Sequence, residues 1–500
     1  MSKPFTKVLI ANRSEVALRL QATCHARGMQ TVAICSPEDR SAHFVHNASE
    51  AYCIARSGYT AYNAMDEIIA IALKSGADAV HPGYGFLSEK AVFAQKVIDA
   101  GLVWVGPRPK SIALMGDKVA ARVTMQQSGV PVIPGFVIDD FSQQACDKAA
   151  ENARAIGFPL MIKDPYGGGG KAMQKVDCSA DFIPALHKVH QEAQQLTGST
   201  SLLVEKYITG GRHIEVQIVG DGERYIHLFE RECSLQRRHQ KIIEETPCCF
   251  VPQPVLEQMY EAALFAARGV AYDSIGTVEF IVTPDNSFYF LEMNTRLQVE
   301  HAITEMTTGI DLVGLQLDLA SGHDLMLQQC TITRQGCAIE CRLYAENPAA
   351  NFMPATGKIQ HFFAPNFPSI RFEHALQQGT EITSLFDPMI AKAVAWAPTR
   401  QQCATRLESF LQQLQIQGVT TNRDFVCALL RSDVFASGAF HTQTIANRSF
   451  VQDILQQTPL TLNDREAVLA GIAYLCMQQQ RKVRREYRVG QRGWKGQQWR

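Results

Sequence analysis

Short apolar segments alternate with amphipathic segments through the first 113 residues, and this alternation constrains the fold more than any other feature. The apolar segments have the length and composition of strands, and they are residues 8–11, 31–35, 79–81 and 103–106. The stretches between them, such as 15–27 and 65–75, have helical spacing. Strands that alternate with helices predict a parallel sheet with helices on its faces.

The rest of the chain divides into segments with different patterns. Residues 114–130 predict a helix that ends near Gly129, followed by a linker at 132–134. Residues 135–206 predict a small α+β unit around a glycine-rich turn. Strand-like segments follow between 207 and 448, and some alternate apolar and polar residues, as expected of a sheet with one solvated face. The clearest are 213–219, 225–230, 275–282 and 287–293.

Charge and composition exclude several functions. The net charge of −1 gives no overall field that would attract nucleic acid or membrane. No apolar run reaches the roughly 18–20 residues of a membrane span. The 14 cysteines are scattered without a CxxC pair, which is typical of reduced thiols. The start of the chain lacks the features of a signal or transit peptide, which favours the cytoplasm and leaves an organelle matrix open.

The end of the chain has its own character. Apolar residues between 464 and 480 recur at helical spacing, and the final twenty residues hold eight Lys or Arg and one acidic residue. A solvated tail is the simpler interpretation of this charge, because no fold motif supports a nucleic-acid arm.

The first candidate site is a run of four consecutive glycines, namely Gly167, Gly168, Gly169 and Gly170. Their backbone N–H groups can approach phosphate oxygens without obstruction by side chains. Lys163 and Lys171 flank them with positive charge. A mobile surface turn is the alternative for this segment alone, since it matches neither a Walker A motif nor GxGxxG.

The second candidate site is a pair of acidic residues in apolar, strand-like settings, Glu279 and Glu292. Carboxylates in such positions are costly unless they are paired or bind a metal. Two adjacent strands could present both to one Mg²⁺, with Asn294 as a further oxygen donor. An ordinary salt-bridged pair is the alternative.

Two polar clusters complete the set. Arg296, Gln298 and Glu300 alternate, so they share one face if this stretch is extended. There, an arginine can hold a small planar anion while a glutamate removes a proton; a local salt bridge is the alternative. The other cluster is a run of cations that a solvated basic loop would also explain, formed by Arg237, Arg238, His239 and Lys241.

Taken together, these segments resemble biotin carboxylase, the ATP-grasp component of biotin-dependent carboxylases. The resemblance covers residues 5–448, and no other ATP-grasp family combines the RRHQK and MNTRxQVEH segments. The motifs are IANRSEVALR (10–19), HPGYGFLSE (81–89), LMGDK (114–118), RECSLQRRHQK (231–241), LEMNTRLQVEH (291–301) and AIECRLYAE (338–346).

The resemblance implies a fold of class α/β and α+β in several parts. These are an N-terminal parallel-sheet domain (1–113), an ATP-grasp domain (114–330) with a mobile glycine-rich lid at about 135–206, a C-terminal biotin carboxylase domain (331–448) and a helical, basic extension (449–500).

It also implies roles for individual residues. Lys118 and Lys163 match the family positions that bind the ATP phosphates. Glu205 matches the position that contacts adenine, and His213 matches a further residue of the nucleotide site. The remaining cofactor-binding positions are Gly167 to Gly170, Met173, Gln236, His239, Gln298 and Val299. Glu279, Glu292 and Asn294 match the metal-binding positions, where two Mg²⁺ or Mn²⁺ ions are expected.

The implied chemistry is the carboxylation of biotin. Lys241, Arg296, Gln298 and Val299 match the residues of the family's bicarbonate pocket. Glu300 matches the general base, and Arg342 matches the arginine that stabilises the biotin enolate. Glu300 deprotonates bicarbonate, which attacks the γ-phosphate of ATP to give carboxyphosphate. Carboxyphosphate then releases CO₂ and phosphate, the phosphate takes the N1 proton of biotin, and the enolate captures CO₂. Positioned cations suit this developing negative charge.

The resemblance also implies partners. The Met-Lys-Met biotinylation site of the family is absent, so biotin is expected on a carrier protein or domain. We further expect a carboxyltransferase subunit, a homodimer, and neither a nucleic-acid nor a membrane partner. The segment after 449 resembles the start of the linker region in acyl-CoA carboxylase α subunits.

Several positions depart from the family pattern. Asp164, Pro165 and Tyr166 replace small residues before the glycines, where Asp164 is expected to pair with Lys163 and compete with phosphate. Ala172 and Ser14 replace glycines, and Pro388 replaces a serine. These departures motivate one alternative, a catalytically impaired scaffold subunit. A second alternative, another ATP-grasp carbon–nitrogen ligase, would need an amine or amino-acid pocket and would not need the RRHQK segment.

Overall fold

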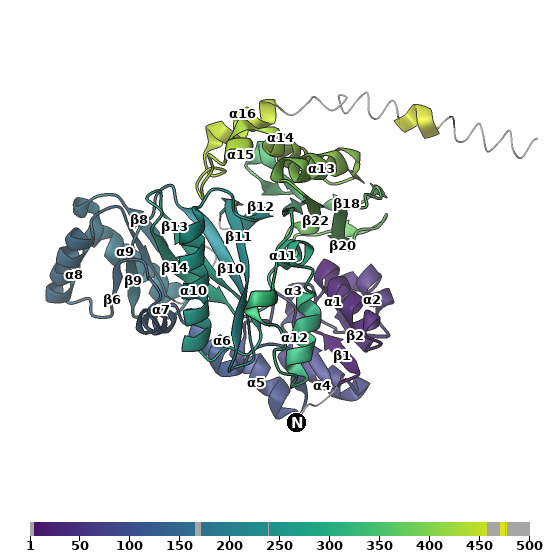
Figure 1. The fold of residues 1–500 in the computed structure, drawn as a ribbon, viewed down its shortest axis with the longest axis horizontal. Coiled ribbons are helices and arrows are strands. Elements are labelled where there is room, and N and C mark those ends of the chain that lie inside the picture. Colours follow the sequence, from purple (N-terminus) through teal and green to yellow (C-terminus); the bar gives the residue numbers. More distant parts are fainter. Residues whose placement is uncertain (1–4, 166–171, 239, 458–470, 476, 478–500) are drawn as a thin grey trace, which may run out of the picture.

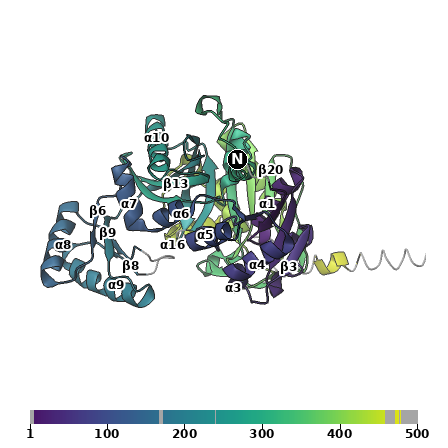
Figure 2. The same cartoon turned by 90° about the horizontal axis from the view of Figure 1, so that it is seen from below.

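A computed structural model describes residues 5–165, 172–238, 240–457, 471–475 and 477. Gly167 to Gly170, Tyr166, Lys171 and His239 lie outside these described residues, as do residues 458–470 and 478–500. Figures 1 and 2 show an N-terminal α/β domain, a central region with a separate lid unit at one end, and a C-terminal region.

The N-terminal domain contains the predicted parallel sheet. Its five strands lie in the order β3-β2-β1-β4-β5, and all neighbours pair in parallel. The strands are β1 (Lys7–Ile10), β2 (Gln30–Cys35), β3 (Glu50–Cys53), β4 (Ala79–His81) and β5 (Val103–Trp104). The main helices are α1 (Ser14–Ala26), α3 (Tyr59–Tyr62), α4 (Met65–Ser75) and α5 (Ala91–Asp99). The prediction of an α/β domain is confirmed. The sequence pattern did not predict β3, because this edge strand is only half-buried.

The single helix predicted over 114–130 is wrong. The chain instead forms α6 (Pro109–Gly116) and α7 (Lys118–Gln127), with Asp117 between them. The Asp117 carboxylate accepts hydrogen bonds from the backbone N–H groups of Val119 and Ala120, at 2.9 and 3.0 Å. This N-cap starts a new helix, and it places Lys118 in the first turn of α7.

The lid unit has its own small sheet and its own core, at the left of Figure 1. Its strands lie in the order β6-β9-β7-β8. The elements are β6 (Gly135–Ile138), α8 (Gln143–Ile156), β7 (Leu160–Lys163), β8 (Met173–Val176), α9 (Phe182–Leu196) and β9 (Leu202–Lys206). β7 and β8 pair in antiparallel fashion, and the glycine-rich segment between them lies outside the described residues.

An eight-stranded antiparallel sheet forms the centre of the molecule, in the order β14-β13-β10-β11-β12-β15-β22-β20. Its strands are β10 (Arg212–Gly220), β11 (Tyr225–Arg237), β12 (Gln240–Thr246), β13 (Ile275–Val282), β14 (Phe288–Asn294), β15 (Cys337–Tyr344), β20 (Ile370–His374) and β22 (Met389–Ala397). β12 pairs with β15, so the sheet runs without a break past residue 330. The expectation of one solvated face is wrong for β13, whose eight residues are all buried.

Helices cover the sheet. α10 (Gln253–Gly269) packs on β10 and β11, while α11 (His301–Thr308) packs on β11, β12, β15 and β22. The C-terminal region adds α13 (Arg400–Gln413), α14 (Arg423–Arg431) and α16 (Arg448–Gln456). No helix within the described residues is long and apolar enough to cross a membrane.

Most of the predicted tail helix lies outside the described residues. The described part of the extension includes α16, whose Val451 and Ile454 are buried in the C-terminal core. The first residues of the extension therefore pack as part of the C-terminal region.

Candidate active site

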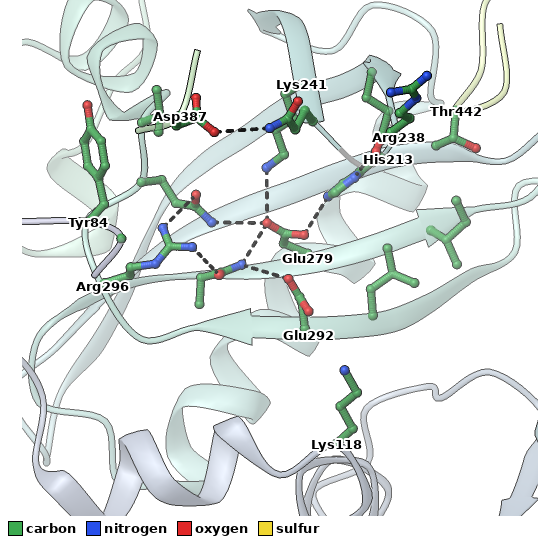
Figure 3. A pocket seen from close by; sticks show the side chains of 18 of the residues that line it. Tyr84, Lys118, His213, Arg238, Lys241, Glu279, Glu292, Arg296, Asp387 and Thr442 are labelled. Carbon is green, nitrogen blue, oxygen red and sulfur yellow. Dashed lines mark hydrogen bonds and ion pairs between the residues drawn. The ribbon is translucent and has the colours of Figure 1, made fainter. Parts of the chain in front are cut away.

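A cavity of about 1100 Å³ lies where the lid unit, the central sheet and the N-terminal domain meet. It gathers most of the side chains that the sequence singled out, as Figure 3 shows in part. The predicted residues that line it are Lys118, Lys163, Met173, Glu205, His213, Gln236, Lys241, Glu279, Glu292, Asn294, Arg296, Gln298, Val299 and Arg342. Glu300 lies directly behind Lys241, and its carboxylate accepts a hydrogen bond from that lysine at 2.5 Å.

Lys241 is the central cation of the site. Its Nζ contacts the carboxylates of Glu215, Glu279 (3.1 Å) and Glu300 (2.5 Å). Burial opposes its charge, but these three carboxylates raise the pKa of Lys241 well above its usual value. The lysine therefore stays protonated and can attract an anion.

The predicted acidic pair comes from neighbouring strands, since Glu279 on β13 is in register with Glu292 on β14. Glu279 is buried and accepts hydrogen bonds from Asn294 (2.8 Å) and Gln298 (3.1 Å). Glu292 is exposed to the cavity, and Asn294 reaches it only at 3.5 Å. Enclosure in the cavity and repulsion from Glu279 raise the pKa of Glu292.

The donor set fits a hard divalent cation. Glu279 and Glu292 offer carboxylate oxygens, and Glu292 has a raised pKa that a nearby cation would lower again. The Asn294 carbonyl oxygen accepts from Arg296 at 2.9 Å, so it would have to leave this arginine to bind a metal. In Figure 3 Lys118 lies below Glu292, from the opposite side of the cavity.

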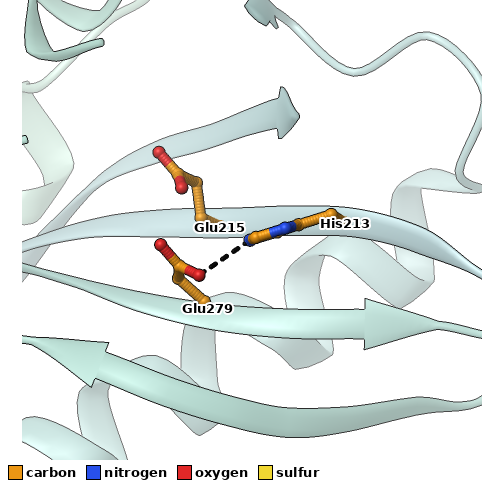
Figure 4. Close-up of side chains that lie close together, drawn as sticks. All are labelled: His213, Glu215 and Glu279. Atoms are coloured by element: carbon orange, nitrogen blue, oxygen red, sulfur yellow. Dashed lines mark ion pairs between the residues drawn. The ribbon is translucent and has the colours of Figure 1, made fainter. Parts of the chain in front are cut away.

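His213 on β10 is directed at Glu279, as Figure 4 shows. Its Nε2 lies 2.9 Å from the Glu279 carboxylate, and its Nδ1 lies 3.1 Å from the amide nitrogen of Gln236. Burial disfavours the charged ring, but Glu279 raises the pKa of His213. His213, Glu215 and Glu279 lie close enough together to hold a metal ion. Lys241 already supplies positive charge to both of these carboxylates.

The stretch that carries Arg296, Gln298 and Glu300 is not extended. β14 ends at Asn294, an irregular segment follows, and Glu300 is the N-cap residue of α11. The side chains nevertheless meet, because the segment curls around the edge of the sheet: Arg296 contacts Asn294 at 2.9 Å, and Gln298 contacts Glu279 at 3.1 Å. The proximity of these side chains therefore comes from the curled segment and not from the alternation of residues along a strand.

Glu300 is fully buried between two cations. Its second oxygen accepts from Arg342 Nη2 at 2.9 Å, while Arg342 also pairs with Glu244 at 2.6 Å. Burial opposes ionisation, but Lys241 and Arg342 hold the pKa of Glu300 well below its usual range. Glu300 is therefore a carboxylate at neutral pH.

The two lysines at the nucleotide-like end lie on different elements. Lys163, at the end of β7, pairs with Glu205 at 2.5 Å, and Arg122 pairs with the same carboxylate at 3.1 Å. Burial and the nearby Lys163 lower the pKa of Lys118. The expected pairing of Asp164 with Lys163 is wrong: Asp164 is buried and accepts a hydrogen bond of 2.5 Å from Thr197.

Two of the glycine replacements adopt the left-handed backbone region. Ser14 has a φ of 58° and Ala172 a φ of 49°. These conformations are costly for residues with a Cβ. Ala172 nevertheless packs in the core of the lid unit.

Several residues of the site were missed. Arg231 is fully buried and holds Glu215 at 2.5 Å, so it fixes one carboxylate of the Lys241 cluster. Glu89 pairs with Arg296 at 3.1 Å. Glu215 lies in an apolar strand just as Glu279 does, so the rule that identified Glu279 applies equally to it. Glu89 and Glu244 lie in local sequences that carry no such signal.

Comparisons with known proteins agree with this geometry. Three family models match the chain: "Biotin carboxylase, N-terminal domain" over residues 4–112, "Carbamoyl-phosphate synthase L chain, ATP binding domain" over 117–328, and "Biotin carboxylase C-terminal domain" over 340–447. The biotin carboxylase of Halalkalibacterium halodurans is 42% identical over 445 residues, which cover 89% of this chain and 98% of that protein. The chain belongs to the biotin carboxylase family. This makes it a member of a family of ATP-dependent ligases with the expected multi-domain architecture.

Other relatives are longer than this chain. The mitochondrial methylcrotonoyl-CoA carboxylase α subunit of Mus musculus is 44% identical over 443 residues, which are 88% of this chain. The chain spans about three fifths of the length of this subunit and of its rat counterpart (61% and 62%).

Solved biotin carboxylases share the fold. One is the biotin carboxylase domain dimer of Hydrogenobacter thermophilus 2-oxoglutarate carboxylase, in complex with MgADP, ADP and bicarbonate. It has a TM-score of 0.84 at 38% identity, covering 89% of this chain and 98% of that chain. Biotin carboxylase from Campylobacter jejuni, in a β-γ-ATP complex, also has a TM-score of 0.84, at 36% identity, covering 89% and 99%.

Proposed function

We propose that this chain carboxylates biotin with ATP and bicarbonate, as the first half-reaction of an acyl-CoA carboxylase. The observation that carries the proposal is the buried carboxylate of Glu300, ionised between Lys241 and Arg342 beside the Glu279–Glu292 pair. A base, anion-binding cations and a metal-type donor set in one cavity suit the joining of bicarbonate to phosphate. Relatives crystallised with MgADP and bicarbonate support the same substrates here.

ATP would lie between the lid unit and β13–β14. Lys118 and Lys163 face this part of the cavity and would hold its phosphates, with Lys163 exchanging Glu205 for a phosphate oxygen. Glu279, Glu292 and Asn294 would hold two Mg²⁺ or Mn²⁺ ions. Such ions neutralise phosphate charge during transfer. His213 and Gln236 would keep Glu279 oriented through the short contacts described above.

Bicarbonate would bind among Lys241, Arg296, Gln298 and Val299. An anion that attracts Lys241 and Arg342 weakens their hold on Glu300, and its own charge repels the carboxylate. Both effects raise the pKa of Glu300 and make it a stronger base at that moment. Glu300 would then take the bicarbonate proton, and the freed oxygen would attack the γ-phosphate of ATP to form carboxyphosphate.

The second step would take place beside Arg342. Carboxyphosphate breaks down to CO₂ and phosphate, and the phosphate accepts the N1 proton of biotin. Negative charge then develops on the ureido oxygen, where the guanidinium of Arg342 would stabilise it. Glu244 keeps this arginine in place through its contact of 2.6 Å.

The domain division and the partners belong to the same proposal. We place the domains at 1–113, 114–330 and 331–448, with a lid at about 135–206 and an extension beyond. A separate biotin carboxyl carrier would supply biotin, a carboxyltransferase subunit would use the product, and two copies would form a homodimer, as in the dimeric relative. The relatives include bacterial enzymes and mitochondrial subunits, and we propose the cytoplasm or an organelle matrix as the compartment.

A specific observation supports a second candidate, an impaired scaffold subunit. Ala172 and Ser14 hold strained backbone next to the cavity, and Pro165 removes a backbone donor from the glycine-rich turn. One assay separates the two candidates: ADP release with bicarbonate, measured with and without biotin. An active enzyme releases ADP in a bicarbonate-dependent way that biotin stimulates, whereas a scaffold releases none.

A further inference from the structure

The cavity has an aromatic wall at the end remote from the lid unit. Tyr59, Tyr84, Phe86 and Phe386 all line it. The rings of Tyr59 and Phe86 lie 5.0 Å apart, Tyr62 lies 5.0 Å from Phe86, and Tyr62 lies 6.0 Å from Phe386. This wall joins the N-terminal domain to the loop before β22, and it is not used in the chemistry described above.

Buried polar contacts fix the wall in place. Tyr62 is fully buried, and its hydroxyl donates to Asp39 at 2.5 Å. Asp39 also pairs with Arg13 at 2.7 Å through two of its nitrogens, and the guanidinium of Arg13 lies 3.6 Å from the ring centroid of Phe386. Such cation–π and bidentate contacts are stronger than isolated surface contacts. The aromatic rings are therefore preorganised.

Two further features point to a binding role. Phe86 has a φ of 46°, a left-handed conformation that is a clear outlier for a bulky residue and that clusters at functional sites. Tyr59 and Leu385 are large apolar side chains with 54% and 43% of their surface exposed. Leu385 packs over Gly58, where an added Cβ would lie 3.0 Å from the Leu385 Cβ. Large exposed apolar groups beside a cavity mark a place for an apolar ligand.

The position of this wall limits what the ligand can be. Asp387 directly follows Phe386 and lies 3.2 Å from the side chain of Gln240, the residue before Lys241. The wall therefore meets the cavity at its bicarbonate end. Figure 3 shows Lys118 on the side of the cavity opposite Asp387, and Lys163 lines the cavity from β7 of the lid unit. Arg342 lines the same cavity, so a molecule that contacts both the wall and this arginine needs an apolar, solvent-facing part and a polar head.

We propose that Tyr59, Phe86, Leu385 and Phe386 form an apolar rim that binds the methylene arm of biotinyl-lysine as it enters from the carrier. This inference rests on the proposed function and extends it, because it identifies where the carrier-borne substrate enters. Burial of each methylene on such a rim strengthens binding about fourfold.

The test measures KM for methylamides of biotin and of two homologues, whose arms are one methylene shorter and one longer. ADP release in the presence of bicarbonate and each amide is the assay. In the unchanged protein, KM falls about fourfold for each added methylene. Tyr59→Ala and Leu385→Ala are expected to reduce the fall in KM per added methylene from fourfold towards no change. Both variants should also raise KM for biotin methylamide about fivefold. Both side chains are exposed, so their removal leaves the core packing intact.

The matched control is Leu73→Ala on α4. Leu73 is as exposed as Tyr59, at 54%. Unlike Tyr59 it does not line the cavity, and unlike Leu385 it is not adjacent in sequence to a residue that does, so this variant should keep the full dependence on arm length. The proposal is overturned if KM still depends on arm length in both rim variants, or if this dependence disappears in Leu73→Ala. If the unchanged protein releases no ADP in response to any biotin amide, the proposed function itself is wrong.

Discussion

Glu300 shows how one residue can be both buried and charged. Its two oxygens contact Lys241 at 2.5 Å and Arg342 at 2.9 Å, and these cations outweigh the cost of burial. Because both cations have other carboxylate partners, Glu215 and Glu244, neutralising Glu300 leaves neither of them unpaired. The residue can therefore be changed without unfolding the site.

Glu300→Gln should reduce biotin carboxylation by about 10²–10⁴-fold while ATP binding stays close to normal. The amide keeps the shape of the side chain but cannot accept the bicarbonate proton, and Glu300 does not line the nucleotide part of the cavity. Carboxylation rate and ATP affinity, measured side by side, check this. Glu346→Gln is the control, since Glu346 pairs with Arg237 at 2.8 Å and does not line the cavity. Near-normal turnover in Glu300→Gln would contradict the assignment.

His81 gives a prediction for pH. It is fully buried at the end of β4, its Nδ1 accepts from the backbone N–H of Gly83 at 3.0 Å, and burial lowers its pKa to about 3. Below about pH 6.5 the unfolded chain takes up a proton here and the folded chain does not, so stability is lost as pH falls. The loss between pH 7 and 5.5 is about 1 kcal/mol.

His81→Asn should remove this part of the pH dependence, because the asparagine oxygen can accept the same hydrogen bond without titrating. Calorimetric Tm values at pH 7 and 5.5 measure the effect, and the variant should lose fewer degrees than the unchanged protein. An equal loss in both proteins would show that His81 titrates normally in the folded state.

Among the elements, the β7–β8 hairpin is held at its base by Asp164. The buried carboxylate accepts from Thr197, just after α9, and the Asp164 N–H donates to Ala172 O at 2.9 Å. Asp164 therefore ties the end of β7 to Thr197 and to Ala172, within the lid unit. Its carboxylate accepts from Thr197, while Lys163 pairs with Glu205.

Asp164→Ala should consequently raise KM for ATP several-fold and lower the Tm, the opposite of relief from competition. Loss of a buried hydrogen bond costs about 1–3 kcal/mol. Thr197→Val is the matched variant, and the double variant should be little worse than either single one. A lower KM for ATP in Asp164→Ala would contradict this prediction and would support the hypothesis that Asp164 competes with phosphate for Lys163.

Hydrophobic pattern predicted the elements well where one face of an element is buried. β1, β2, β4 and β13 lie where short apolar segments indicated them. β3 could not be found in this way, because in this edge strand partly buried residues alternate with exposed ones and none is fully buried. The break at Asp117 was missed because both helices are amphipathic, and only the cap distinguishes them. The meeting of Arg296, Gln298 and Glu300 depends on a curled segment, which local periodicity cannot show.

For the whole molecule, α16 tests how far into the extension the C-terminal core reaches. Its Val451 and Ile454 are 8% and 2% exposed and pack in the C-terminal core. Their burial contributes about 3–6 kcal/mol. A chain ended at Asn447 should therefore melt at a clearly lower temperature, whereas a chain ended at Gln457 should keep its Tm and its bicarbonate-dependent ADP release. Equal melting temperatures for the two would show that α16 is dispensable.

The same comparison addresses the extension. We expect residues after 457 to matter for co-purification with a carboxyltransferase subunit and not for chemistry. The chain ended at Gln457, mixed with that subunit, checks this by pull-down. Retained binding would show that the partner is held elsewhere.

The unbroken central sheet has a consequence for how the protein is made. β12 is complete at Thr246, but β15, its neighbour, begins only at Cys337. At about 5–20 residues per second on the ribosome, the edge of β12 stays open for roughly 5–20 s. An open edge invites pairing with other nascent chains. β12 carries Lys241, Glu244 and Glu245, and charged side chains on an open edge oppose such pairing. Lys241 and Glu244, which serve the finished site, are therefore expected to protect the unfinished sheet from aggregation as well.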